Sequence, residues 1–319
     1  MTKPLSIALT FDLDPDVFDA SIDPESHRSR LTWLCITLGI SRIQEALTSV
    51  SAFRGVAPPC TWFVRVDNQI ADIYGRPAYL LKEHDEIFRA AQKRGDEISW
   101  HPHLYRRVGG NWMQETDDTA LAEALKSSVA DMRQMGYQVE CSRIGEAYGS
   151  SGIMRSLSEL GIKYDATAMA GRRRVDDQRL IDWLPTPSDG YRPSRADHRV
   201  PGKPDFPIIE VPMSMLQVKA EYDERPILRY LDLSFHPASL ATGLSDLVKD
   251  APHLVAVTHP SAILAECRPS KAHGLLSYAI EGLVENVLAI IACAEAAGRS
   301  VQFVTMSNLG RQIEKRIDA

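Results

Sequence analysis

Ser6-Ile7-Ala8-Leu9-Thr10-Phe11-Asp12-Leu13-Asp14 is a buried-strand pattern that runs directly into two carboxylates. Three more strand-like runs end on residues that bind metal ions or transfer protons. They are Glu97–Trp100 before His101 and His103, Val139–Ser142 before Arg143, and Leu254–Thr258 before His259. Because α/β barrels carry their active sites at the ends of several strands, with helices between those strands, this arrangement predicts an α/β barrel enzyme.

The spacing inside two of these clusters predicts that their side chains converge. Residues two apart on a strand point to the same face, so Asp12 and Asp14 share one. His101 and His103 do the same if the strand continues, and Pro102 favours extended geometry in the residue before it. Carboxylates and imidazoles suit zinc or another first-row divalent ion with positions left open for water and substrate. The pattern predicts a catalytic metal site.

Composition limits the kind of protein this chain can be. Its 319 residues, 44% hydrophobic and 24% charged, are enough for one large α/β domain. We find no linker-like segment and no internal repeat, so we expect a single catalytic domain over 1–319, with a long loop insertion near 166–207. The net charge of −6 argues against a nucleic-acid partner.

Cysteine usage and hydropathy indicate the compartment. The five cysteines form no Cys-x-x-Cys pair, which favours ordinary reduced thiols. No secretory-type apolar segment follows Met1, and no run is long enough to cross a bilayer. We therefore expect a cytoplasmic protein without membrane insertion. A predicted helix near 273–297 has enough apolar positions to pack on both the barrel and a second subunit, so a homo-oligomer stays open.

Apolar periodicity divides the chain into alternating strands and helices, which predicts a mostly parallel sheet. Strands are predicted over 6–11, 60–64, 97–100, 139–143, 162–165, 181–184, 208–212, 229–233, 254–258 and 301–305. Helices are predicted over 31–53, 77–93, 117–135, 151–160, 238–249 and 273–297.

Taken together, the motifs resemble the polysaccharide deacetylase superfamily, which includes carbohydrate esterase family 4. They are Thr10-Phe11-Asp12-Leu13-Asp14, Thr61-Trp62-Phe63-Val64, Gly95 to His101, Arg143, Leu157 to Asp165 and Thr258-His259-Pro260. The resemblance spans roughly residues 5 to 308, with the motifs in the family's order. It implies a distorted (β/α) barrel of about seven strands. It also implies removal of acyl groups from amides or esters, most often N-acetyl groups on amino sugars.

The same resemblance implies a role for each matching residue. Asp12 takes the place of the catalytic base, and Asp14 that of the metal-binding aspartate. His101 matches the first metal histidine, Arg143 the arginine that holds the base, and His259 the histidine that protonates the leaving group. The implied cofactor is a divalent metal, with Zn²⁺ the first choice and Co²⁺, Ni²⁺ or Mn²⁺ compatible with the same ligands.

The sequence departs from the family pattern at three points. Leu13 separates two aspartates that are usually adjacent, as in a branch that deformylates lipid-linked sugars. The second metal histidine usually lies four residues after the first, where this chain has Tyr105. Either His103 replaces it or the metal is held differently. The usual Arg-Pro-Pro segment is altered to Arg143-Ile144-Gly145-Glu146. These changes predict a divergent branch.

Several side chains are candidates for contacts with the substrate, because aromatic faces pair with sugar rings and loops at a barrel mouth carry specificity. The candidates are Trp100, Tyr105, Glu146, Tyr148, Tyr191 and Arg192. Each has a structural alternative, since aromatic side chains are more often packing and Glu146 could form a plain salt bridge. Arg143 could likewise bind an anionic group of the substrate instead of holding Asp12.

Three hypotheses follow from the sequence. The first is a metal-dependent deacetylase acting on a small N-acyl sugar or a polysaccharide precursor. The second is a hydrolase of a non-sugar amide, like the allantoinase and cyclic-imide branches of the same superfamily. The third is a catalytically inactive barrel that binds a glycan or a partner. The presence of Asp12, Asp14, His101 and His259 together argues against the third.

Overall fold

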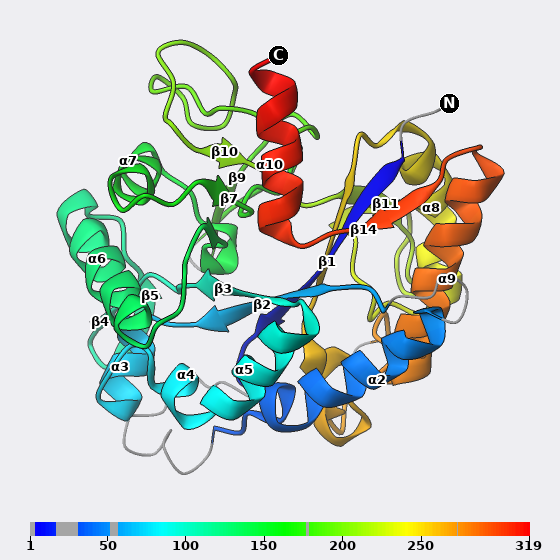
Figure 1. The fold of residues 1–319 in the computed structure, drawn as a ribbon, viewed down its shortest axis with the longest axis horizontal. Coiled ribbons are helices and arrows are strands. Elements are labelled where there is room, and N and C mark those ends of the chain that lie inside the picture. The colour runs from blue at the N-terminus through cyan, green and yellow to red at the C-terminus, as the bar shows by residue number, and fades with distance from the viewer. Residues whose placement is uncertain (1–3, 17–30, 52–56, 177–178, 273) are drawn as a thin grey trace.

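The central strand of the fold is β1 (Leu5–Leu13), and all nine of its residues are buried. The computed structural model describes residues 4–16, 31–51, 57–176, 179–272 and 274–319 (Figure 1). β1 pairs in parallel with β2 (Cys60–Arg65) on one side and with β13 (Leu254–Thr258) on the other. Burial on both faces explains why this stretch of sequence is almost continuously apolar until Asp12.

The main sheet is parallel and curled. Its strand order is β10 (Ile209–Glu210), β7 (Tyr164–Asp165), β6 (Cys141–Ser142), β3 (Glu97–His101), β2, β1 and β13. An eighth strand, β14 (Val301–Phe303), pairs with the first residues of β1 off this path. The predicted distorted barrel of about seven strands is confirmed. Every strand of the path presents its carboxyl end at the same rim, which brings residues distant in sequence together.

Loop residues, rather than a further ladder, bridge the two outer strands of the main path. The Ser214 amide donates to the Val255 carbonyl at 3.2 Å, and the Val257 amide donates to the Leu231 carbonyl at 2.9 Å. Leu231 in turn donates to Ser214 at 2.7 Å. The gap between β10 and β13 is therefore spanned by irregular backbone, which leaves room at the rim for side chains and a ligand.

The helices surround this sheet (Figure 1). They are α2 (Ile40–Ser51), α3 (Asn68–Tyr74), α4 (Tyr79–Glu83), α5 (Asp85–Arg94), α6 (Asp118–Gln134), α7 (Ser151–Glu159), α8 (Pro237–Asp250), α9 (Ile280–Ala296) and α10 (Met306–Ile317). α9 packs between α2 and α8, and α6 packs on α7. None of the helices in the described ranges is long and apolar enough to span a bilayer.

Three antiparallel hairpins decorate the barrel and correct part of the strand prediction. They are β4 (Tyr105–Val108) with β5 (Asn111–Gln114), β8 (Arg173–Val175) with β9 (Leu180–Asp182), and β11 (Met215–Val218) with β12 (Ile227–Tyr230). The runs expected at 181–184 and 229–233 lie in these hairpins and not in the barrel. Periodicity detects a strand without identifying its partner, and the partner here is the preceding strand.

Helix boundaries differ from the predictions at three places, and α3 was not predicted. The helix expected over 77–93 is divided at His84 into α4 and α5. The helix expected over 31–53 begins as a π-helical turn at Cys35–Gly39, and residues 52–53 lie outside the described part of the chain. The helix expected from 273 begins at Ile280, after Tyr278 adopts a left-handed φ of 48°. α10 was not predicted. Short 3-10 turns lie at Gly145–Ala147, Pro260–Ala262 and Ala265–Cys267.

Candidate metal centre and active site

Three side chains at the rim bring potential metal ligands together. Asp14 follows β1, His101 ends β3, and His103 lies two residues later. His101 Nε2 is 3.2 Å from His103 Nε2 and 3.6 Å from Asp14 Oδ2, and His103 Nε2 is 3.3 Å from Asp14 Oδ1. Tetrahedral ligands bound at zinc distances lie roughly 3.3 Å apart. The spacing therefore fits one divalent ion, and His103 provides the second imidazole expected in place of Tyr105.

The protonation states of His103 and Asp14 also fit a metal. For His101, burial is outweighed by the charges of Asp12 and Asp14, which raise the pKa of this imidazole. His101 Nδ1 donates to the Arg143 carbonyl at 2.7 Å, which leaves Nε2 as the ligand atom. Burial and the nearby Arg65 charge hold the pKa of His103 well below its usual range, so this imidazole is neutral. Burial alone would raise the pKa of Asp14. His103, His101 and His259 outweigh burial and hold that pKa well below its usual range.

Asp12 forms a buried ion pair with Arg143. Arg143 Nη1 donates to Asp12 Oδ1 at 2.6 Å and to the Thr10 hydroxyl at 2.9 Å, while Nε donates to the Ala166 carbonyl at 3.0 Å. The guanidinium lies 4.1 Å from the Phe63 ring centre, and the residue is 1% exposed. Arg143 is thus positioned to hold Asp12. The second carboxylate oxygen of Asp12 remains 4.0 Å from His101 Nε2.

His259 follows β13 and reaches the same point from the other side of β1. Its Nε2 lies 3.3 Å from Asp14 Oδ2, and its side chain is 35% exposed, more than that of any metal-ligand candidate. Burial would lower its pKa, but the hydrogen bond to Asp14 and the charges of Asp12, Asp14 and Asp232 raise the pKa of His259 to about 9. At neutral pH this side chain can donate a proton.

Arg65 is a residue of the site that the sequence reasoning missed. It ends β2, is 3% exposed, and Nη1 donates to Asp14 Oδ1 at 3.0 Å. Nε donates to Asp67 at 2.6 Å, and Asp67 also accepts the His103 backbone amide at 3.1 Å. Arg65 therefore orients two of the three ligands. An arginine directly after the predicted strand at 60–64, followed by Asp67, was the available signal.

Glu146 and Tyr105 are linked to each other at the edge of the site. The Tyr105 hydroxyl donates to Glu146 Oε1 at 3.0 Å, and Glu146 Oε2 pairs with Arg179 at 3.0 Å. Glu146 lines the metal cavity, and both it and Ala147 have left-handed backbone, with φ of 57° and 50°. Such backbone strain in residues other than glycine concentrates at functional sites. Glu146 stays a candidate substrate contact, and Tyr105 supports it.

The other four predicted substrate contacts lie elsewhere. Trp100 is fully buried and donates to the Val66 carbonyl at 2.8 Å. The Tyr191 hydroxyl donates to the His198 carbonyl at 3.1 Å, and Arg192 pairs with Asp318 at 3.0 Å near the C-terminus. Tyr148 is buried in the hydrophobic core and does not line the metal cavity. None of the four lines either cavity of the site, because Trp100, Tyr148 and Tyr191 are buried by packing and Arg192 is held in an ion pair with Asp318.

The other histidines that the structure describes lie outside the centre. His236 is exposed and precedes α8 without lining either cavity described below. His253 and His198 are buried or half-buried, and desolvation lowers the pKa of each to about 4. His84 is also desolvated, which lowers its pKa. His27 and His273 lie outside the described residues.

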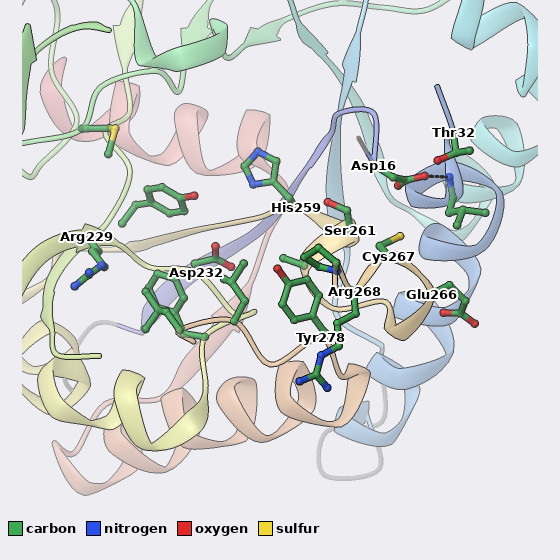
Figure 2. Close-up of a pocket in the computed structure, with 18 of the residues that line it drawn as sticks. Asp16, Thr32, Arg229, Asp232, His259, Ser261, Glu266, Cys267, Arg268 and Tyr278 are labelled. Carbon is green, nitrogen blue, oxygen red and sulfur yellow. Dashed lines mark hydrogen bonds between the residues drawn. The ribbon is translucent and has the colours of Figure 1, made fainter. Parts of the chain in front are cut away.

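Two cavities meet at the metal centre. The smaller, about 200 Å³, is lined by Asp12, the three candidate ligands and apolar side chains that include Ile144 and Val257. The larger, about 720 Å³, adjoins it, and Met169, Tyr230 and His259 line both. Figure 2 shows His259 at the edge of this larger cavity, above Asp232 and Tyr278. A ligand at the metal centre can therefore extend past His259.

Comparisons with known proteins place the fold. No protein-family model and no curated protein matches the sequence. A Mycobacterium smegmatis protein assigned as a polysaccharide deacetylase is similar in structure, with a TM-score of 0.56 and 17% identity over 99% of this chain and 92% of that one. A 4-α-glucanotransferase from Thermococcus litoralis has a TM-score of 0.50 and 11% identity, covering 96% of this chain and 40% of that one.

A family 4 carbohydrate esterase from Streptomyces lividans, in complex with acetate, is less similar. Its TM-score is 0.41, with 9% identity over 96% of both chains. At such identities the comparisons show the fold alone. The chain has the polysaccharide deacetylase fold, which confirms the expectation drawn from its motifs. Because a deacetylase-type protein and a glucanotransferase match the same chain, the function has to be argued from the site.

Proposed function

We propose that this protein is a metal-dependent amide hydrolase that removes a small acyl group from nitrogen. The observation that supports it is the convergence of Asp14, His101 and His103 at ligand spacing, beside an arginine-held Asp12 and an exposed His259. The small cavity around them, about 200 Å³ and largely apolar, has room for a formyl or acetyl group.

The three-ligand set would supply one part of the chemistry. A divalent ion held by Asp14, His101 and His103, with zinc the first choice, polarises a substrate carbonyl and lowers the pKa of a nearby water when it is bound. Arg65 keeps Asp14 oriented toward His103 through its contacts with Asp14 and Asp67. This support is typical of metal sites, in which outer partners fix the ligands.

Proton transfer is assigned to the two residues beside the ligands. Asp12, held by Arg143, accepts the proton of the water whose oxygen attacks the carbonyl carbon. His259 gives its proton to the departing nitrogen as the C–N bond breaks, because an amine without that proton is a poor leaving group. The products are a carboxylic acid and an amine, and one water is consumed. The same pair can serve an N-acyl amino sugar or another N-acyl amine.

Metal content tests this proposal first. We expect about one equivalent of zinc or a related ion in the purified protein by elemental analysis, and a sharp loss in His103→Ala. Cobalt loading gives an independent readout, since a tetrahedral Co²⁺ centre with visible absorption should form in the native chain and not in the variant. Release of acetate from simple N-acetyl amines by the loaded native protein completes the test.

A negative result has a defined meaning. If the protein binds no divalent ion even after reloading, the hydrolase mechanism fails and a binding function replaces it. If it binds metal but His103→Ala binds it equally well, the three-ligand assignment is wrong. The surface variant Lys126→Ala on α6, away from the rim, controls for general effects of substitution.

A further inference from the structure

The larger cavity lies on the side of the site where the leaving amine emerges. His259 lines both cavities, and it is the residue assigned to protonate the departing nitrogen. A substrate whose acyl group occupies the small cavity of about 200 Å³ therefore extends its amine portion past His259 into the space of about 720 Å³. That volume is typical of a pocket for a small organic molecule. The residues that line this cavity therefore indicate the chemistry of the amine portion.

One wall of this cavity is apolar. It is formed by Met169, Leu228, Tyr230, Phe235, Leu275 and Leu276. Met169, Phe235 and Leu275 are each less than 10% exposed, so they are fixed by the core behind them. Such a surface gains free energy by covering an apolar body, on the order of 25 cal/mol per Å² removed from water.

The acidic groups around the cavity already have partners. Asp16 accepts the backbone amides of Leu34 and Cys35, and Glu266 pairs with Arg42 at 2.6 Å. Asp232 accepts from the backbone amide and the hydroxyl of Ser234. A sugar ring brings several hydroxyl groups, and each one buried without a partner costs about 1–3 kcal/mol.

Of the three lining arginines, two are also engaged. Arg229 pairs with Asp223 at 2.9 Å, and Arg172 donates to the Leu228 carbonyl at 3.0 Å. Within the described part of the chain, the Arg268 guanidinium has no hydrogen-bond or ion-pair partner. Arg268 is exposed, and Figure 2 shows it beside Tyr278 on the side of the cavity away from His259. A cation without a described partner therefore lines the same cavity as the proton donor, on the side away from it.

We propose that the substrate is an N-acyl amine with an apolar, ring-sized body between the acylated nitrogen and a distal anionic group such as a carboxylate. The body fills the larger cavity and the anion contacts Arg268. This inference rests on the proposed amide hydrolase function, and it names the substrate class of that site. It favours a non-sugar amide over an amino sugar, because the cavity has a largely apolar lining and, among the described residues, one lining arginine without a partner, Arg268.

Four N-acetyl probes separate the two features of this proposal. They are 4-(2-acetamidoethyl)benzoate, its neutral methyl ester, N-acetylglucosamine and N-acetylglucosamine 6-phosphate. Binding is measured by calorimetry on metal-loaded Asp12→Asn protein, in which turnover is blocked.

We expect the benzoate to bind roughly tenfold more tightly than either sugar, because of its apolar body. Arg268→Ala should weaken benzoate binding about fivefold and leave the ester unchanged. Arg268→Lys should retain most of the affinity, and Lys126→Ala on α6 should change nothing.

The outcomes separate this inference from the proposed function. If either sugar binds as tightly as the benzoate, or Arg268→Ala weakens ester and benzoate equally, the substrate class is wrong. Acetate release from the sugars alone would overturn the substrate class and keep the hydrolase function. Selective benzoate binding that depends on Arg268, without acetate release by the native protein, would support the cavity assignment and refute the hydrolase function.

Discussion

Two pairs of acidic side chains lie at strand ends of the same sheet and have opposite electrostatic surroundings. Asp12 and Asp14 at the end of β1 each contact an arginine, Arg143 and Arg65. Asp165 and Glu210 end β7 and β10 and face each other across the ladder, and neither forms an ion pair within the described residues. The first pair faces the cavity, and the second is fully buried.

The difference shows that neighbours, more than residue type, decide what a carboxyl group can do. Histidines surround Asp14 and hold its pKa well below the usual range, although burial opposes this. Burial raises the pKa of Asp165, and burial together with the charge of Asp165 raises that of Glu210 well above the usual range. The first pair therefore suits metal binding and proton acceptance, whereas burial favours the protonated form of the second pair.

The largest expected effect is on turnover, and it comes from replacing Asp12 of the first pair. Asp12→Asn keeps the size of the side chain but removes the proton acceptor, so turnover should fall by about 10³-fold. Metal content should stay near the native value, because Asp14, His101 and His103 are untouched. Steady-state acetate release and elemental analysis of the same preparation check both halves. Full activity in this variant would remove Asp12 from the role of base.

Removing the Arg65 cation should leave Asp14 without an arginine partner, which is the situation of Asp165 and Glu210 within the described residues. Arg65→Gln leaves Asp14 and Asp67 without their guanidinium, and breaking such a buried pair costs about 3–5 kcal/mol of unfolding free energy. Metal affinity should fall by about 10–100-fold, as when outer-shell partners are lost. Urea denaturation measures the change in unfolding free energy, and competition with a metal chelator measures the change in metal affinity. Unchanged metal affinity would show that Arg65 does not orient the ligands.

A smaller change tests how closely the ligands must be placed. A Cβ on Gly145 would lie 2.0 Å from the His103 ring, so Gly145→Ala should displace that imidazole and lower metal affinity by roughly tenfold. Gly274→Ala is the matched control, because the nearest atom to its Cβ would be 3.6 Å away. Chelator competition on both variants gives the comparison. Equal affinities would mean that the site adapts and that His103 is loosely held.

The smallest effect is expected at the second pair. Glu210→Gln mimics a protonated carboxyl, so it should change unfolding free energy at neutral pH by no more than about 1 kcal/mol. The sign of the pH dependence follows from the raised pKa. In the native protein this group stabilises most below its unfolded pKa of about 4.3, and that contribution is lost as pH rises toward the raised folded pKa.

Urea denaturation across a pH series tests the second pair. The native chain should lose stability over that range with a steeper slope than Glu210→Gln, which lacks the titrating group. Parallel slopes for the two proteins would show that Glu210 is not the group that titrates over this pH range. A loss of several kcal/mol at neutral pH that disappears in acid would instead mean that Glu210 is ionised in the folded protein.

Much of the fold and half of the site could be predicted from local patterns. Strand periodicity located β1, β2, β3 and β13, and the residues that end them proved to be the metal centre candidates. Side-chain alternation also predicted that His103 would join His101, which the distances bear out. Arg65 was missed because its position after a strand, with Asp67 close behind it, does not identify Asp14 as its partner 51 positions away. Tyr191 and Arg192 were misplaced because a long irregular segment carries no periodicity.

The sequence by itself determined the central strands of the parallel sheet and the identity of the residues that follow β1, β3, β6 and β13, because these follow from short-range periodicity. Only the tertiary structure decided which arginine meets which aspartate, which carboxyls are buried together, and that His259 and Arg268 line one cavity in which Arg268 has no partner among the described residues. The contact between Arg143 and Asp12 joins residues 131 positions apart, and its energy depends on burial and distance, which no local pattern encodes.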